Sequence, residues 1–162
     1  KNLKSVSEYT GQPEMQGGLV KTLDFKIYLG LLSETYNESH SKDLQRTGAV
    51  AMDIVVVNLY PFKQTITKAG VTPEMARTNI DIGGPCMVRA AAKNFIRTVS
   101  LTSPTDYDSV LAEMKQSGGM ISLKTRFEMA KKAFAHTADY DAAIAKYMAE
   151  RKVDEIRGCY HV

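Results

Sequence analysis

An acidic residue followed by two glycines and a proline, Asp81-Ile82-Gly83-Gly84-Pro85, is the part of the sequence around which we organise the chain. Glycine has no Cβ, so the backbone amides of Gly83 and Gly84 can approach a bound group closely. Pro85 fits the first position of a helix, where its missing N–H would have had no partner. The segment therefore predicts a loop that turns into a helix, with free N–H donors beside a carboxylate.

The helix predicted after this loop covers residues 85–93 and ends with a lysine. A little over two turns separate Pro85 from Lys93, so the ammonium reaches a ligand at the loop only if the side chain extends or the chain folds back. The same pattern fits a short core helix with Val88 facing inward and Lys93 solvated, because a glycine-opened helix is a weak signal. Spacing alone leaves both interpretations open.

The composition is that of one globular domain. The chain has 162 residues, of which 44% are hydrophobic and 24% charged, enough for a proper core. No apolar run approaches the roughly eighteen residues that span a bilayer, and no charged-then-apolar leader is present, so we expect a cytoplasmic protein with no membrane partner. The net charge of +3 comes from interspersed charges, which suits an anionic small ligand and does not indicate nucleic-acid binding.

Cysteine and histidine are too scattered to suggest a metal site. Cys86 and Cys159 stand far apart, and His40, His136 and His161 share no ligand spacing with them or with each other. A zinc site or a disulfide framework needs tighter grouping. We therefore expect no metal.

Two apolar segments are predicted to be strands of a parallel sheet. Residues 52–60 form a nearly continuous β-branched run ended by Pro61, which is typical of a strand buried on both faces. Residues 97–102 are predicted as another strand. Asn58 and Tyr60 stand at the carboxyl end of the first strand, where ligands bind in open α/β sheets, although strand-end packing explains them equally well.

Helices are predicted between and after these strands. One starts at Thr72, whose side chain can cap it, and another runs from a capping box at Ser103 to about Ser117. The longest opens at Ser122 and carries an apolar stripe at three- and four-residue steps, which we interpret as core or an interface. The stripe consists of Leu123, Phe127, Ala130, Phe134, Ile144, Tyr147 and Met148.

The order of these elements predicts an α/β domain with a mostly parallel sheet over residues 1–150. Residues 151–162 are interpreted as a C-terminal tail, either poorly ordered or docked on a partner subunit.

Four segments resemble the IMP cyclohydrolase domain of the bifunctional purine-biosynthesis enzymes. They are residues 55–62, 79–94 and 125–141, together with Gly-Leu-Val-Lys-Thr-Leu at 18–23, which is similar to the family's Gly-Arg-Val-Lys-Thr-Leu motif. The resemblance covers nearly the whole chain in colinear order. It implies a three-layer, methylglyoxal-synthase-like α/β fold, usually a homodimer, with no cofactor and no metal.

The resemblance also implies a ring closure on a purine nucleotide substrate. The carboxamide nitrogen of 5-formamidoimidazole-4-carboxamide ribonucleotide attacks the formyl carbon, and water leaves to give IMP. An amide nitrogen is a poor nucleophile, so its proton must pass to an acceptor while negative charge grows on the formyl oxygen. By similarity, the residues around the base and the reacting groups are Lys21, Thr22, Asn58, Tyr60, Asp81, Ile82, Gly83 and Lys93.

Four of these residues would be catalytic. Asp81 would accept the proton or polarise the carboxamide. Lys21, Lys93 and Tyr60 would face the oxyanion. The other four would bind substrate, with the backbone of the last two holding the base: Thr22, Asn58, Ile82 and Gly83.

The chain departs from the family pattern near its start. Leu19 replaces an arginine, and Asp24, Phe25 and Tyr28 stand where the family has His-Pro and a further histidine. The family's first strand–helix–strand unit, which holds the nucleotide phosphate, has no counterpart, so we expect an N-terminally incomplete domain.

Three functions remain open from these observations. The retained acid and lysines favour an IMP cyclohydrolase without transformylase activity. The departures favour a non-catalytic nucleotide- or phosphate-sensing domain of the same fold. An interaction protein that assembles through the apolar stripe is the third possibility.

Overall fold

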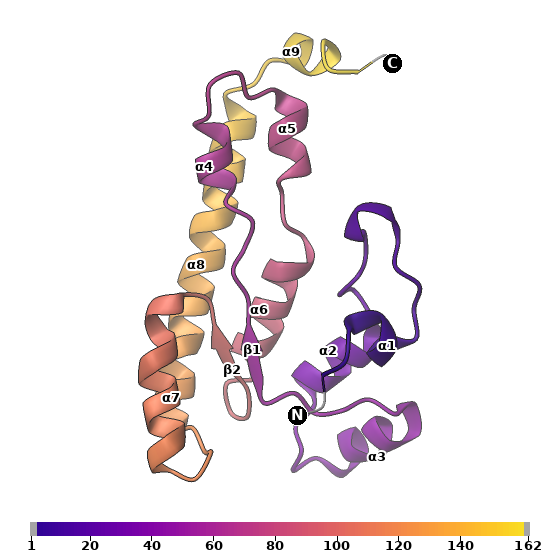
Figure 1. Cartoon of the computed structure of the whole chain (residues 1–162), viewed down its shortest axis with the longest axis vertical. Helices are drawn as coiled ribbons and strands as arrows, with labels where there is room; N and C mark the ends of the chain where they lie inside the picture. Colours follow the sequence, from indigo (N-terminus) through magenta and orange to yellow (C-terminus); the bar gives the residue numbers. More distant parts are fainter. Residues whose placement is uncertain (1–2, 161–162) are drawn as a thin grey trace.

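The longest helix, α8, runs along the molecule and sets its length (Figure 1). The structure is a computed structural model that describes residues 3–160. Its strands are β1 (Ile54–Val56) and β2 (Val99–Leu101). Its helices are α1 (Val6–Thr10), α2 (Phe25–Leu32), α3 (Glu38–Thr47), α4 (Phe62–Ile66), α5 (Pro73–Thr78), α6 (Gly83–Lys93), α7 (Tyr107–Gln116), α8 (Leu123–Ala149) and α9 (Val153–Arg157), with 3-10 turns at Gln16–Gly18 and Pro104–Asp106.

The two strands pair in parallel, as the sequence predicted. Ile54 lies opposite Val99, and Val56 lies opposite Leu101. The Val57 N–H extends the ladder by donating to the Leu101 carbonyl at 3.0 Å. Each strand is only three residues long, so the predicted segments 52–60 and 97–102 contain the strands but overstate their length.

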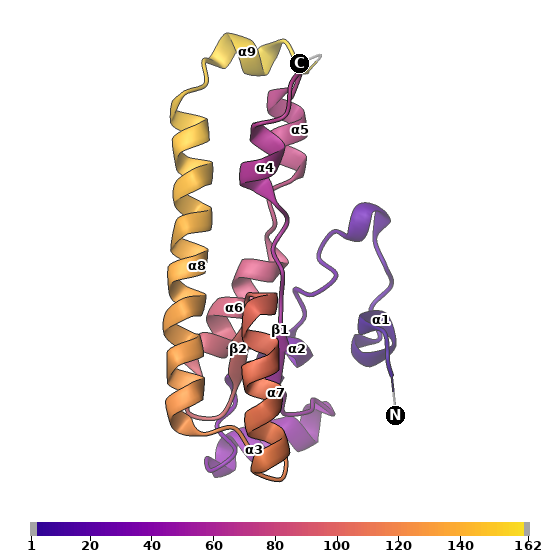
Figure 2. The same cartoon turned by 60° about the vertical axis from the view of Figure 1, so that its left-hand side comes forward.

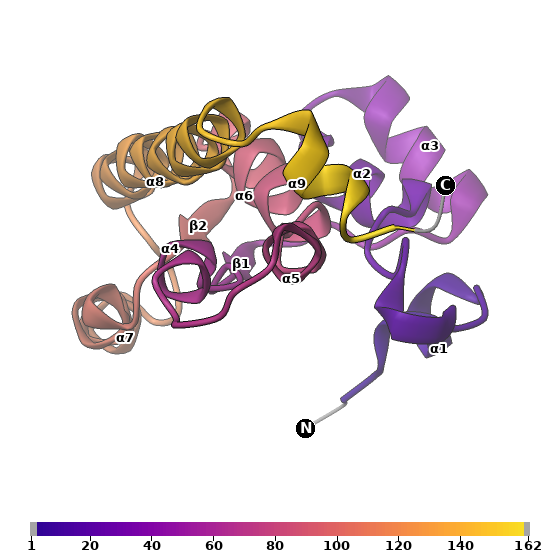
Figure 3. The same cartoon turned by 90° about the horizontal axis from the view of Figure 1, so that it is seen from above.

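One face of the sheet lies on α6 (Figure 3). Val55 and Ser100 are cross-strand partners on this face, and the Ser100 hydroxyl donates to the Val88 carbonyl of α6 at 3.4 Å. Val55 also belongs to a core cluster with Ile27 and Leu31 of α2. Helices α2 and α6 therefore form the layer on this side.

Within residues 3–160, the opposite face is covered only over β2. Val99 and Leu101 pack there with Val110 of α7 and Met129 of α8, and all four are buried. Helix α7 thus supplies the third layer, and α8 packs along β2 and α6.

The prediction that the first strand is buried on both faces is wrong. Val55 is buried, but Ile54 and Val56 are 38% and 52% exposed, because none of the described helices packs over β1 on the α7 side. A β-branched run specifies a strand, whereas the number of covered faces depends on what packs against it.

Helices α6 and α8 meet through small side chains. Val88 and Ala92 of α6 pack against Ala130 and Ala133 of α8, which allows the two backbones to approach closely. The predicted stripe on α8 is only partly core. Ala130 and Tyr147 are buried, whereas Leu123, Phe127, Phe134 and Met148 are 39–54% exposed.

The C-terminal segment folds back onto α5, as Figure 2 shows at the top of the molecule. Arg77 Nε of α5 donates to the Tyr160 hydroxyl at 2.9 Å, and that hydroxyl also contacts the Glu74 carboxylate. The predicted tail therefore contains α9 and contacts its own chain. None of the helices within residues 3–160 combines the length and the apolar character needed to cross a bilayer.

Arg97 joins the end of α2 to the start of β1. Its guanidinium donates to the carbonyl oxygens of Ser33 at 3.0 Å and Met52 at 2.9 Å. A third carbonyl, that of Gly30, accepts at 2.5 Å, and the Asp53 carboxylate lies 3.3 Å away. Only 11% of the arginine side chain is exposed, so water cannot readily replace it as a donor to these oxygen atoms.

We expect Arg97→Met to lower the free energy of unfolding by roughly 2–4 kcal/mol, because the carbonyls of Gly30, Ser33 and Met52 each lose the charged one of their two donors. Urea unfolding followed by circular dichroism measures this loss. Arg46→Met is the matched control, since that side chain is 74% exposed and pairs only with Asp43; its effect should stay within about 0.5 kcal/mol. Equal losses in the two variants would contradict the role given to Arg97.

Candidate functional site

The loop before α6 holds Asp81 in a fixed position. Its carboxylate accepts a hydrogen bond from the Gly84 N–H at 2.9 Å, and its own N–H donates to the Tyr140 hydroxyl of α8 at 2.8 Å. Tyr140 is itself buried, and burial raises the pKa of its hydroxyl. The carboxylate therefore lies beside the positive end of α6, and the backbone of Asp81 is held by α8.

Gly83 and Gly84 are closely packed against other side chains. A Cβ at Gly83 would lie closer than 3.0 Å to the Thr22 hydroxyl, and one at Gly84 would clash in the same way with Asp81 and Leu59. The sequence predicted that these glycines admit a bound group. In the structure they admit side chains from two other segments, so Thr22, Asp81 and Gly83, three of the predicted site residues, do come together.

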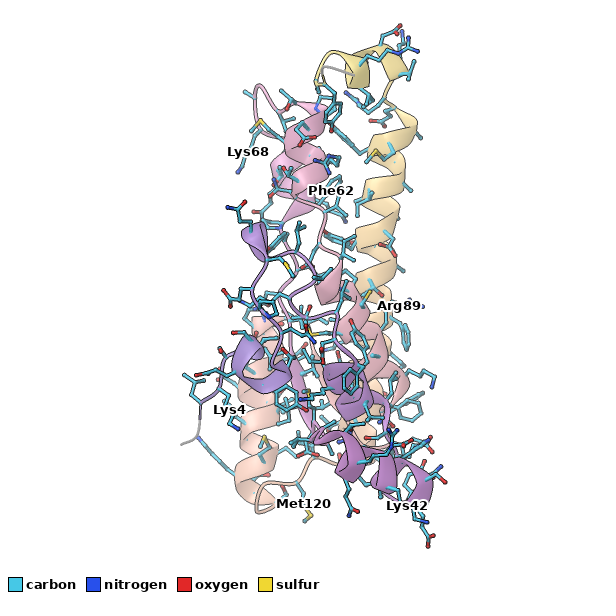
Figure 4. The ribbon with its side chains drawn as sticks, turned by 90° about the vertical axis from the view of Figure 1, so that its right-hand side faces the viewer. Lys4, Lys42, Phe62, Lys68, Arg89 and Met120 are labelled. Carbon is cyan, nitrogen blue, oxygen red and sulfur yellow. The ribbon has the colours of Figure 1, made fainter. Side chains whose placement is uncertain are left out.

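Tyr140 owes its position to an aromatic cluster at the upper end of α8. Phe62 of α4 is 1% exposed and packs edge-on against Tyr140 and Tyr147, with ring centroids 6.3 and 5.8 Å apart. Figure 4 labels Phe62 where it lies between α4 and α8. The cluster packs α4 against α8 and thereby fixes the position of the Tyr140 hydroxyl, which accepts the hydrogen bond from the Asp81 N–H.

Asn58 and Tyr60 line a cavity of about 240 Å³ beyond the carboxyl end of β1. The cavity is completed by Thr102, which follows β2, and by His136 and Tyr140 of α8. The Asn58 amide donates to the Tyr107 hydroxyl at 3.2 Å. The two residues predicted at the strand end therefore do lie in a hollow bounded by both strand ends.

The two predicted catalytic lysines lie apart from this cavity. Lys21 lines a separate cavity of about 290 Å³ and its ammonium lies 3.4 Å from the Glu14 carboxylate. Its neighbour Thr22 nevertheless touches the Gly83 backbone, so the Lys21 main chain is beside the loop. Lys93 is exposed at the last position of α6, roughly 15 Å along the helix axis from Gly83 at 1.5 Å per residue.

The turn that carries Lys21 is strained. Val20 has φ of +54°, although a β-branched residue strongly disfavours this region. Leu19 and Val20 are 70% and 61% exposed, so the strain is not compensated by core packing. Such strain is concentrated at binding sites and switch regions.

Two residues of the site were not predicted from the sequence. His136 and Tyr140 lie one turn apart on α8, which places both on the face toward the loop and the strand ends. His136 was considered in the sequence only for metal binding, which the scattered cysteines and histidines did not favour. In the sequence, the four-residue spacing between His136 and Tyr140 indicates that the two side chains share one helix face.

The chain is similar to known proteins over most of its length. The family model for the AICARFT/IMPCHase bienzyme matches residues 91–161. The bifunctional purine biosynthesis protein PurH of Thermoanaerobacter sp. (strain X514) is 52% identical over 150 residues, which are 93% of this chain and 29% of that protein. Its counterpart from Synechococcus sp. (strain CC9605) is 48% identical over 154 residues, 95% of this chain and again 29% of the relative.

A solved structure, described as the crystal structure of ForH, is 34% identical to the chain with a TM-score of 0.72, and the match covers 86% of this chain and 73% of that one. It supports the predicted methylglyoxal-synthase-like α/β fold class, in agreement with the observed parallel sheet. The chain spans less than a third of the length of these PurH relatives. With about half of its residues identical to theirs over nine-tenths of its length, the chain belongs to the AICARFT/IMPCHase family of purine-biosynthesis proteins.

Proposed function

We propose that the chain is an IMP cyclohydrolase, which closes 5-formamidoimidazole-4-carboxamide ribonucleotide to IMP with loss of water. The observation that supports this most is the meeting of Thr22, Asp81 and Gly83 at the start of α6, in a chain about half identical to PurH proteins. These residues come from the segments that carry the resemblance. We also propose a homodimer, as is usual for the family.

The reaction needs a base near the carboxamide and donors near the formyl oxygen. The carboxamide nitrogen bonds to the formyl carbon, and two N–H protons leave with the formyl oxygen as water. Asp81 suits the first need, because one carboxylate oxygen is held by the Gly84 N–H while the carboxyl group is only partly buried. A positioned carboxylate of this kind typically contributes a hundredfold or more to proton transfer.

Lys21 suits the second need once its ammonium leaves Glu14. The pair spans 3.4 Å between side chains that are 45% and 57% exposed, so it contributes at most about 1 kcal/mol and yields readily to an anionic substrate. The strained turn at Val20 adds a second reason for the segment to rearrange on binding. Tyr60, 57% exposed at the cavity, needs no such rearrangement to face the ligand.

Of the four proposed catalytic residues, Lys93 has the least support from its position. It lies at the far end of α6 from Asp81, so it acts on a different part of the substrate or only after the substrate bridges the helix. This separation favours the second candidate, a domain of the same fold that binds a purine nucleotide without converting it. Turnover and binding, measured separately, distinguish the two candidates.

We expect the chain to convert the formylated substrate to IMP, followed by the absorbance of the product. Asp81→Asn and Lys21→Ala should each lower kcat about a hundredfold or more, because each removes a charged group that acts on the transition state. Lys68→Ala, which removes an exposed lysine between α4 and α5, is the control and should keep full activity. Binding of IMP without turnover in the unchanged chain would instead support the sensing domain.

Lys93→Ala tests the remaining assignment by itself. If its ammonium faces the oxyanion, kcat falls about a hundredfold while the circular dichroism spectrum and the melting temperature stay unchanged, because the side chain is exposed and the helix ends there. Near-normal ring closure would remove Lys93 from the catalytic set without affecting Asp81 or Lys21.

Tyr140→Phe is expected to lower kcat about tenfold through the position of Asp81. The ring stays packed on Phe62, but the Asp81 N–H loses its acceptor, and a hydrogen bond of this kind contributes about 0.5–1.5 kcal/mol. Tyr36→Phe, at a tyrosine that is 66% exposed, is the control. A Tyr140→Phe variant as active as the control would show that this contact does not orient the carboxylate.

A further inference from the structure

His136 has a buried ring nitrogen without a partner. Its Nε2 is inaccessible to solvent and forms no hydrogen bond with any residue from 3 to 160. His40, by contrast, accepts a hydrogen bond through Nδ1 from the Glu34 N–H at 3.1 Å. A buried polar atom left unpaired costs about 1–3 kcal/mol, so such an atom in a folded protein calls for an explanation.

Several of the polar groups around His136 are engaged with other residues. Its ring lines the cavity at the strand ends, where the Asn58 amide is engaged with the Tyr107 hydroxyl. At the rim, Lys63 and Asp139 form an ion pair at 2.6 Å with each other. Because the ring lines the cavity, an occupant can supply the missing partner once the ring turns its buried nitrogen toward it.

The charge of the cavity indicates what kind of group that is. Lys63 is the one cation among the lining residues, and Asp139 neutralises it. A phosphate needs uncompensated cations or a set of free backbone amides, whereas a neutral heteroaromatic amide needs a few polar atoms between apolar walls. The lining provides polar side chains in Asn58, Thr102 and His136 beside the apolar surfaces of Leu59 and Phe62.

We propose that His136 is a substrate-binding residue that hydrogen-bonds the base of the purine nucleotide in this cavity. The choice of a purine nucleotide as the ligand rests on the proposed function. The added element is His136 as a residue that binds the base. An imidazole ring either donates or accepts, and rotation about its soft Cβ–Cγ torsion turns a nitrogen toward the cavity. Tyr140, one turn along α8, holds Asp81, so one helix face would hold both the base and the catalytic loop in place.

The test uses binding to the whole chain by calorimetry, with IMP and with ribose 5-phosphate as probes. His136→Leu removes the polar ring at similar size. We expect it to leave the melting temperature unchanged or raise it, because an unpaired buried nitrogen disappears, and to weaken IMP binding by about five- to fiftyfold. Ribose 5-phosphate, which lacks the base, should show no difference between the variant and the unchanged chain.

His40→Leu is the matched control. It should lower the melting temperature, because the Glu34 N–H loses its acceptor, and leave the Kd of IMP unchanged. The proposal fails if His136→Leu binds IMP as tightly as the unchanged chain, if both probes weaken equally, or if the unchanged chain does not bind IMP. IMP binding that depends on His136 without any turnover would uphold this inference and overturn the cyclohydrolase.

Discussion

Close packing around the first turn of α6 is the constraint on which the other contacts depend. The space that a Cβ would fill at Gly83 and Gly84 is occupied by Thr22, Leu59 and Asp81, so two segments distant in sequence converge on the helix start beside its own loop. From there α6 passes beneath the sheet and contacts both strands, α2 and α8. A Cβ at either glycine would force the side chains that surround it to shift.

Helix α8 connects this part of the molecule to the rest through packing contacts. Its alanines allow α6 to approach closely, while Met129 reaches the far face of β2. Farther along, Tyr140 packs on Phe62 and holds the Asp81 backbone. One helix of 27 residues thus contributes to the core and to the candidate site.

The site combines rigid and strained parts. Asp81 is held by two hydrogen bonds, whereas Lys21 sits after a valine with positive φ and pairs only with an exposed glutamate. Rigid placement favours a base that must not move during proton transfer. A strained, exposed turn favours a group that rearranges when an anionic ligand arrives. The rigid part is the loop before α6, and the strained part is the segment before α2.

The sequence by itself determined the local elements and the family. The caps at Thr72 and Ser122, the β-branched run around Val55 and the helical period after Leu123 act through neighbouring residues, so the corresponding helices and strands were predicted. Tertiary structure alone decided which faces were covered. It left Ile54 and Val56 exposed, separated Lys93 from Asp81 by the length of α6, and placed His136 in a cavity without a partner, because burial and convergence depend on packing between distant segments that no local pattern records.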